Sequence, residues 1–283
     1  TATSYTVTGL TNGTSHIFKV AAVNANGTGT YSANSSAVTP YTVPGAPTSV
    51  TGTRGAGQVS LSWTAPASNG GSAVTDYAVQ YSSDSGSTWT TFTDGVSTAT
   101  TATVTGLTNG TAYVFRTAAV NAAGTGTYST ASAAVTPSTT AGAPTSVTGT
   151  GGNTQVALTW TAPVSNGGGA ITGYSVQYSS NSGSTWTSAT TNSASTVTSY
   201  TVTGLANGTS YLFKVAAVNA AGTGTYSANS SAITPYTTPA AATGLAGTRG
   251  DAQVALTWTA GANNGSAITG WSVQYSSNSG STW

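Results

Sequence analysis

The chain has no cysteine, no methionine and, among its acidic residues, no glutamate. Without cysteine, neither a disulfide nor a thiolate metal site can form. Charge is also scarce: five Lys or Arg and four Asp make up 3% of the 283 residues, and the net charge is +1. An ordinary soluble protein has roughly 25% charged residues. Binding to nucleic acid or to an acidic membrane surface needs a basic patch, so we expect neither partner.

Long apolar runs are missing as well. No stretch approaches the roughly 20 apolar residues of a membrane-spanning helix, so we expect no membrane span. A nearly neutral surface lacks the repulsion that keeps identical proteins apart, which favours self-association, lateral or end to end. Neither an initiating Met nor a signal peptide begins the sequence, and we expect that Thr1 is not the first residue of the gene product.

What the chain does contain is an internal repeat. Trp63, Trp160 and Trp258 are spaced by 97 and 98 residues. That period is too long for a solenoid unit, which rarely exceeds about 50 residues, and long enough for a domain with its own core. The pattern divides the chain into an N-terminal partial repeat (1–40), a first complete repeat (44–137), a second complete repeat (142–235) and a C-terminal partial repeat (239–283).

The segments that join the repeats are short and contain proline: TPYTVPGAP, TPSTTAGAP and TPYTTPAAA. Because proline restricts the backbone, they predict a semi-rigid rod. The two partial repeats together fall eight or nine residues short of one repeat, and neither can close a core alone. Two hypotheses follow: the chain is a window from a longer series of repeats, or the C-terminal part of one protomer completes the N-terminal part of the next, as in donor-strand assembly.

Within each repeat, apolar and polar residues alternate with the period of two that is typical of β-strands. The stretch from Gly204 to Gly224 predicts a half-buried strand, with Phe213 and Val215 facing inward. Seven or so short strands in about 95 residues predict an all-β fold, an antiparallel sandwich. In the first complete repeat, the predicted inward-facing residues are Val59, Leu61, Trp63, Tyr77, Val79, Tyr81, Ala102 and Val104.

Several features together make the chain resemble tandem fibronectin type III domains of the bacterial kind, over its whole length. They are the APTSV openings at Ala46 and Ala143, Trp63 and Trp160 on the second strand, Tyr77 and Tyr174 on the third, and the pairs Leu107 with Tyr113 and Leu205 with Tyr211. The resemblance implies immunoglobulin-like sandwiches in which the Tyr113 and Tyr211 hydroxyls bond to backbone a few residues upstream. It does not fix a function, since the family provides spacer, adhesive and receptor modules.

One motif resembles the Asp-box hairpin. Ser82, Asp84, Gly86, Thr88 and Trp89 spell S-x-D-x-G-x-T-W. In such a turn the Asp side chain caps the loop, the glycine takes a positive φ and the Trp anchors the hairpin. The other copies carry Asn181 and Asn278, which are suited to the same role. We interpret the motif as a structural turn and not as a sign of a glycosidase.

Two further motifs have weak functional interpretations. Arg249, Gly250 and Asp251 spell the integrin-binding tripeptide in the first loop of the C-terminal partial repeat, where we attribute them to chance. His16 is the only histidine and occupies the position of Tyr113 and Tyr211. Without a second His, Cys or carboxylate nearby it makes a poor metal site, so we interpret it as a polar replacement that keeps one hydrogen bond.

Lys19, Arg116 and Lys214 occupy one outward position. An isopeptide crosslink would need a lysine, an asparagine and a carboxylate, which this composition does not supply in each copy. We therefore predict a solvated cation that discourages pairing at a sheet edge or contacts a neighbour. Sequons for N-glycosylation, several of them Asn-Gly turns, leave glycosylation open. They begin at Asn12, Asn26, Asn34, Asn109, Asn207, Asn229 and Asn264.

We predict no catalytic, cofactor-binding or metal residues, and hence no enzyme. One histidine cannot supply a recurring Ser-His-Asp triad, and four scattered Asp supply neither a glycosidase carboxylate pair nor a calcium site. In the alternating pattern of their strands, the inward-facing positions include Tyr77, Tyr174 and Trp271, so we expect these residues to be buried. We therefore expect no exposed strip of aromatic side chains that could bind sugars. Surface carbohydrate nevertheless remains a candidate partner.

The sequence as a whole favours a non-enzymatic structural rod in an extracellular or cell-surface bacterial filament, sheath or stalk. The nearly identical repeats, the short linkers and the uncharged Ser- and Thr-rich surface are the reasons. Two alternatives remain open: an adhesin stalk, and spacer domains of a secreted polysaccharide-active enzyme. Both place a domain of another kind beside the repeats.

Overall fold

The computed structural model describes residues 2–283, so Thr1 of the predicted N-terminal partial repeat lies outside the described residues. The described residues form strands, turns and loops. No helix among them is long and apolar enough to cross a bilayer. The chain divides into two compact units, Thr1–Thr139 and Thr140–Trp283. Each unit holds one complete and one partial repeat.

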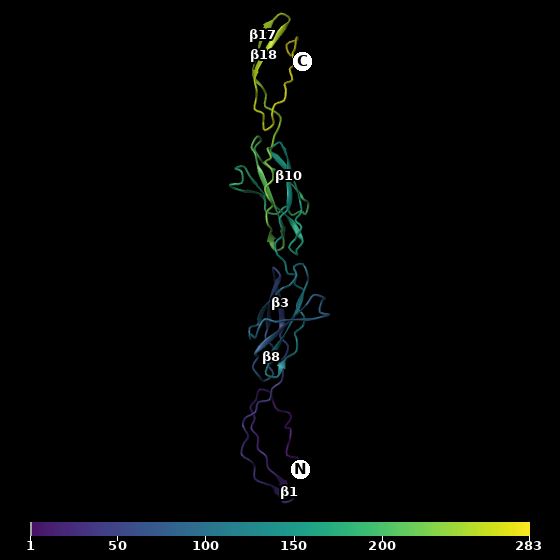
Figure 1. Cartoon of the computed structure of the whole chain (residues 1–283), viewed down its shortest axis with the longest axis vertical. Helices are drawn as coiled ribbons and strands as arrows, with labels where there is room; N and C mark the ends of the chain where they lie inside the picture. The colour runs from purple at the N-terminus through teal and green to yellow at the C-terminus, as the bar shows by residue number, and fades with distance from the viewer. Residues whose placement is uncertain (1) are drawn as a thin grey trace. The chain divides into compact units, whose positions relative to one another are not determined.

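The first complete repeat consists of two antiparallel sheets (Figure 1). The smaller sheet has the strand order β3-β4-β7 and the larger has the order β6-β5-β8-β9. The seven strands are β3 (Thr48–Gly55), β4 (Gln58–Thr64), β5 (Asp76–Ser82), β6 (Thr90–Phe92), β7 (Thr101–Thr105), β8 (Val114–Asn121) and β9 (Gly124–Thr125). The predicted all-β antiparallel sandwich is confirmed.

The second complete repeat has the same topology, with the strand orders β10-β11-β14 and β13-β12-β15-β16. Its strands are β10 (Thr145–Gly152), β11 (Gln155–Thr161), β12 (Ile171–Ser179), β13 (Thr187–Thr190), β14 (Ser199–Thr203), β15 (Leu212–Asn219) and β16 (Gly222–Thr223). The partial repeats contain short pieces of the same pattern: β1 (Val23–Asn24) with β2 (Gly27–Thr28), and β17 (Thr243–Gly250) with β18 (Gln253–Thr259).

The core of the first complete repeat lies between its two sheets. On β4, Val59, Leu61 and Trp63 are buried while the intervening Ser60 and Ser62 are exposed, as the alternation predicts. Tyr77 from the opposite sheet meets Trp63 edge to face, with 5.2 Å between the ring centroids. This geometry is favourable because the positive edge of one ring meets the negative face of the other.

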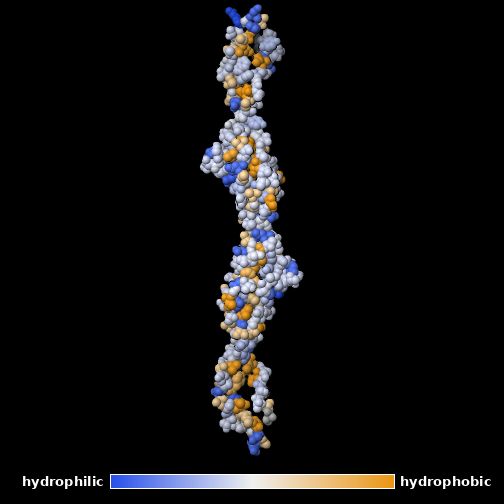
Figure 2. Space-filling model, in the orientation of Figure 1, coloured by the Kyte–Doolittle hydropathy of each residue, from blue (hydrophilic) through white to orange (hydrophobic). Residues whose placement is uncertain are grey.

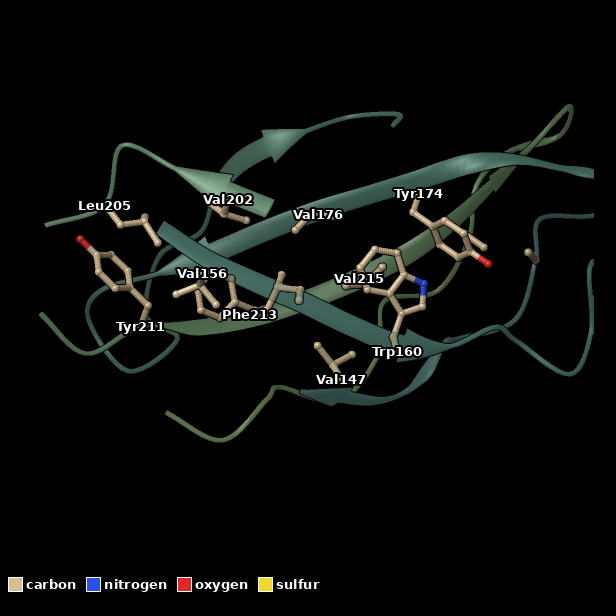
Figure 3. Close-up of a cluster of buried hydrophobic side chains, with 13 residues drawn as sticks. Val147, Val156, Trp160, Tyr174, Val176, Val202, Leu205, Tyr211, Phe213 and Val215 are labelled. Atoms are coloured by element: carbon tan, nitrogen blue, oxygen red, sulfur yellow. The ribbon is translucent and has the colours of Figure 1, made fainter. Parts of the chain in front are cut away.

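The second core repeats this packing. Trp160 and Tyr174 lie edge to face, with their centroids 5.0 Å apart, and Phe213 and Val215 of β15 fill the space beside them (Figure 3). Tyr211 lies at the Leu205 end of the same core (Figure 3). The side chains of both sheets therefore interlock along the whole length of β15.

One prediction about β15 is wrong. Alternation predicts burial on one face, but Ala216 and Ala217, which point to opposite faces, are both fully buried. The outer face is covered because the Tyr226 hydroxyl hydrogen-bonds the Ser175 hydroxyl at 2.8 Å, and Ser175 is the cross-strand partner of Ala216. A small residue in the middle of the strand leaves room for the ring above it.

Candidate functional site

The outer face of the larger sheet carries a cation held between two aromatic rings. In the first complete repeat, Cζ of Arg116 lies 4.1 Å from the ring centroid of Trp89 and 4.5 Å from that of Tyr128. Arg116 Nε also donates to Gln80 Oε1 at 2.8 Å. All four side chains are half-buried. Each contact of this kind contributes about 0.5–1 kcal/mol near the surface. We call this arrangement the cation–aromatic stack.

The second complete repeat has the same stack, built on lysine. Nζ of Lys214 lies 4.1 Å from the centroid of Trp186 and 4.9 Å from that of Tyr226. In the N-terminal partial repeat, Lys19 Nζ lies 4.8 Å from the centroid of Tyr31. The stack is thus a recurring feature of the repeat, present with one ring at Lys19 and with two in each complete copy.

The surroundings of these cations differ from those that the sequence predicts. The predicted role of discouraging pairing at a sheet edge is wrong, because β8 lies between β5 and β9 and β15 lies between β12 and β16. The alternative role, contact with a neighbouring molecule, stays a prediction. Alternation correctly predicts the outward direction but cannot show what lies above the strand. A signal was present in the spacing: a tyrosine follows each cation by twelve residues, at Tyr31, Tyr128 and Tyr226.

Asp84 holds the turn that follows β5. Its Oδ1 accepts hydrogen bonds from the Ser82 hydroxyl at 2.6 Å and the Thr88 backbone N–H at 2.9 Å, and its Oδ2 accepts one from the Thr88 hydroxyl at 2.6 Å. Gly86 takes a φ of +92°. These bonds, with that of Ser82 first, lower the pKa of Asp84 to about 2. A carboxylate so stabilised as an anion is a poor proton donor near neutral pH.

The asparagines of the other copies make the same turn, as predicted. Asn181 Oδ1 accepts from the Thr185 N–H at 2.9 Å, and its Nδ2 donates to the Thr185 hydroxyl at 2.8 Å. Asn278 bonds Thr282 in the same way, at 3.0 Å and 2.8 Å. The motif therefore serves the hairpin in every copy that the chain contains.

The hydrogen bond of the tyrosine corner, expected from the family resemblance, is confirmed. The Tyr113 hydroxyl accepts from the Thr108 N–H at 3.2 Å, and the Tyr211 hydroxyl accepts from the Ala206 N–H at 3.1 Å. His16 does not reproduce this bond. Its backbone pairs with Val38, but its Nε2 is buried with no hydrogen-bond partner in residues 2–283. The prediction that His16 keeps a hydrogen bond is therefore not met at Nε2.

The Arg249, Gly250 and Asp251 tripeptide lies mostly in a strand. Arg249 and Gly250 end β17, with Arg249 paired to Val254, and only Asp251 lies in the turn to β18. The prediction that all three lie in a loop is therefore wrong. In the first complete repeat, Arg54 pairs with Val59 at the equivalent position. The register of this hairpin is therefore the same whether its turn contains Ala56 or Asp251.

Aromatic residues of core parity are buried only in the complete repeats. Tyr77 and Tyr174 are 6% and 1% exposed, as predicted, but Trp271 is 47% exposed. The burial prediction for Trp271 is wrong because the C-terminal partial repeat lacks the strands that cover this position elsewhere. Trp271 instead packs edge to face on Trp258, with 5.3 Å between the centroids.

The Asn-Gly sequons serve the loops in which they lie. Asn109 Oδ1 accepts from the Gly57 N–H at 2.8 Å, and Asn207 Oδ1 accepts from the Thr154 N–H at 2.9 Å. Both bonds tie the turn before the tyrosine corner to the hairpin of the smaller sheet. These amides have a structural role, which agrees with the interpretation of the sequons as turns.

The remaining titratable groups do not converge. Within residues 2–283 no three His, Cys, Asp or Glu side chains gather as metal ligands would. Burial, and to a smaller extent the charge of Asp76, raise the pKa of Asp94, while the Asp76 carboxylate accepts from the Ser97 N–H at 3.0 Å. Burial also raises the pKa of Tyr77, opposed by the indole of Trp63. Asp94 lies in a loop, Asp76 begins β5 and Tyr77 lies in the core.

The chain contains two seven-stranded sandwiches in tandem, and this is the architecture of immunoglobulin-like modules. The cations held in stacks and Asp84 held in its turn serve that architecture. The chain belongs to the fibronectin type III domain family, whose model matches residues 45–135 and 142–233. A tandem array of this family supports a structural role.

Relatives come from several contexts. The chain is 31% identical over 229 residues to human myomesin-2, covering 78% of this chain and 16% of that protein. It is 34% identical over 303 residues to exoglucanase B of Cellulomonas fimi, covering 97% of this chain and 25% of that protein. It is 39% identical over 177 residues to chitinase A1 of Niallia circulans, covering 59% of this chain and 22% of that protein. The chain thus spans a quarter or less of each of these relatives.

Proposed function

We propose that this chain is a non-enzymatic structural component of an extracellular or cell-surface bacterial filament, sheath or stalk. The observation that supports this most is the character of the exposed faces. Arg116 and Lys214 are held between aromatic rings and Asp84 is held in its turn, while the outward residues of β4 and β11 are small and uncharged. Surfaces of this kind pack against one another without charge repulsion.

A second candidate is a spacer within a secreted polysaccharide-active enzyme. The similarity to exoglucanase B and chitinase A1, which are named for the breakdown of polysaccharides, favours it. In that case the repeats would hold a catalytic domain at a distance from a second domain or from the cell. An extracellular location is common to both candidates.

Immunogold electron microscopy tests the proposal. Antibodies raised against the purified chain would be applied to intact cells of the source bacterium, to material sheared from their surface and to the culture fluid. Serum pre-absorbed with the purified chain is the control. We expect label along filaments, sheath or surface stalks. Label confined to soluble secreted protein with polysaccharide-degrading activity would support the second candidate instead, and label confined to the cytoplasm would contradict both.

A further inference from the structure

The sheets of the second complete repeat end in four edges, and β14 forms one of them. Among the strands of residues 2–283, β14 pairs with β11 alone. An open edge carries backbone N–H and C=O groups that can pair with a further strand, so proteins interrupt their edges with bulges, prolines, charges or very short strands. The edge that lacks such protection is where a partner strand can add.

The other three edges are interrupted. β10 has a register shift between Thr145 and Thr148, and its Gly152 carbonyl already accepts a hydrogen bond from the Tyr236 N–H at 3.1 Å. β13 has four residues and a register shift in its pairing with β12, and β16 has two residues. β14 has five residues in unbroken register, and it contains neither proline, nor glycine, nor a charged residue. It is therefore the unprotected edge of this sandwich.

The hydrogen bonds to β11 show which backbone groups of β14 face the open edge. The Trp160 N–H donates to the Thr198 carbonyl at 3.1 Å. Because bonded pairs alternate along an antiparallel ladder, Tyr200 and Val202 also direct their N–H and C=O groups to β11. The groups of the three residues that alternate with them face outward instead. These residues are Ser199, Thr201 and Thr203, and their side chains are exposed.

The second complete repeat is almost without charge. Its one charged residue, Lys214, lies in the cation–aromatic stack on the other sheet. The first complete repeat contains five charged residues, so β7 offers a similar edge in a less neutral setting. Figure 2 shows that much of the visible surface of the chain is pale, as is expected where Ser, Thr and Gly predominate. A neutral edge favours a neutral partner, and this chain, with a net charge of +1, is one.

β14 is also a good partner for its own copy. If two β14 strands run antiparallel with Thr201 opposite Thr201, then Ser199 of each copy lies opposite Thr203 of the other. Each of these three pairs would exchange two hydrogen bonds, because the same residues face outward in both copies. Between them, Tyr200 would lie opposite Val202, an aromatic and β-branched pair of the kind that stabilises sheets. No other antiparallel register uses all three outward residues.

We propose that a second copy of this chain pairs laterally through β14, antiparallel and centred on Thr201, so that two three-stranded sheets become one six-stranded sheet. This deepens the proposed function by naming a lateral contact of the assembly, and it rests on that function only for its location. Because both copies use the same residues, the contact is isologous and joins chains in pairs. Its hydrogen bonds link uncharged groups, so association should change little with salt.

Analytical ultracentrifugation of the purified chain over a concentration series tests the pairing. We expect a monomer–dimer equilibrium that persists at high salt. Thr201→Lys should weaken dimerisation about tenfold or more, because two ammonium groups would lie directly opposite each other. Thr201→Asp should do the same, while an equimolar mixture of the two variants should restore the dimer through opposite charges.

Thr150→Lys is the matched control for the added charge. Thr150 is exposed on β10, at the far edge of the same sheet, so this variant should dimerise like the unaltered chain. Circular dichroism verifies that all the variants remain folded.

Disulfide trapping tests the register, since the chain has no native cysteine. The Cα atoms of a hydrogen-bonded antiparallel pair lie about 5.5 Å apart, within the range that a disulfide spans. Thr201→Cys chains should therefore crosslink with one another under mild oxidation. Ser199→Cys chains should crosslink with Thr203→Cys chains, while Thr203→Cys chains alone should not.

Hydrogen exchange of single amides, followed by NMR, gives a third readout. The outward amides of Ser199, Thr201 and Thr203 should exchange fast in dilute solution and slowly in concentrated solution. The Tyr200 amide, which faces β11, should stay protected in both and serves as the internal control.

Three results would overturn the proposal: a monomer at every concentration, dimers that Thr201→Lys leaves intact, or outward amides that exchange at the same rate at every concentration. Any of these combined with surface filaments labelled by immunogold would remove the pairing and leave the proposed function standing. Dimers through β14 without extracellular label would do the reverse.

Discussion

Arg116 and Lys214 occupy the same place in their sheets but differ in how their polar atoms are used. The planar guanidinium of Arg116 stacks on two rings while its Nε bonds Gln80. Gln80 also donates from Nε2 to the Thr91 hydroxyl at 3.2 Å, as the equivalent Gln177 does to the Ser188 hydroxyl at 3.5 Å. A guanidinium supports stacking and directed hydrogen bonds together, whereas an ammonium acts as a point charge.

Exchanging the two cations should therefore shift stability in opposite directions. Lys214→Arg should stabilise the second complete repeat by about 0.5 kcal/mol, and Arg116→Lys should destabilise the first by a similar amount. Native-state hydrogen exchange with mass spectrometry resolves the two repeats by peptide, so each serves as the internal control of the other. Lys214→Arg in a Trp186→Ala background should lose most of its gain. A gain of equal size without the ring would contradict the stack as its cause.

The pKa of Asp84 is the second prediction at this scale. A folded-state pKa of about 2, below the ordinary 3.8, means that the carboxylate stabilises the turn above pH about 4. That stabilisation should be lost as the pH falls from 3.8 towards 2, because the unfolded chain takes up the proton first. Titration of the carboxyl carbon by NMR measures the pKa directly.

Asp84→Asn is the control for this titration, since Asn181 and Asn278 make the same turn. It should remove the acid-dependent loss while keeping the hairpin. The raised pKa of Asp94 changes the pH dependence of stability in the opposite direction. Its contribution cancels in the comparison, because the unaltered chain and Asp84→Asn both contain Asp94. An Asp84 carboxyl that titrates near 3.8 would contradict the hydrogen bonding described for the turn.

Among the elements, alternation along a strand predicts direction well. It correctly gives Val59, Leu61 and Trp63 as the buried side of β4, because a period of two fixes which residues share a face. It fails for Ala216 and for the cations, because what covers the outer face depends on a tyrosine twelve residues further along the chain. The face to which a side chain points follows from its own strand, whereas the residue that covers this face comes from another segment of the chain. Alternation also fails for Trp271, which packs on Trp258 as its equivalents Tyr77 and Tyr174 pack on Trp63 and Trp160, yet is 47% exposed.

The tyrosine corner gives a prediction for the loop between β14 and β15. Tyr211→Phe removes the acceptor for the Ala206 N–H and should destabilise the second complete repeat by about 1 kcal/mol. Hydrogen exchange at Ala206 should accelerate, while Thr108 beside the untouched Tyr113 keeps its rate. Unchanged exchange at Ala206 would mean that another group satisfies this N–H.

On the scale of the whole molecule, each complete repeat has its own closed core. The buried clusters around Trp63 and around Trp160 share no residue. Domains with separate cores unfold as separate units when the interface between them contributes little. Stability in this chain is therefore expected to be a property of each repeat.

Trp160→Ala tests that independence. Removing a large buried aromatic costs about 3–5 kcal/mol, which is much of the 5–15 kcal/mol available to a whole domain. We expect peptides of β11, β12 and β15 to lose protection from hydrogen exchange, while those of β4, β5 and β8 keep theirs. Trp63→Ala should give the mirror result. Loss of protection in both repeats from either variant would show that the two repeats unfold together.

The matching registers of the two complete repeats also affect how the chain must be made. β4 pairs with β7 through the same five positions that join β11 to β14, so a strand from one repeat fits the wrong neighbour almost as well as its own. A chain diluted out of denaturant faces every such mispairing at once. A ribosome releases the repeats one after another, and each can close before its near-copy emerges. Refolding yield should therefore fall as copies are added, while yield from synthesis should not.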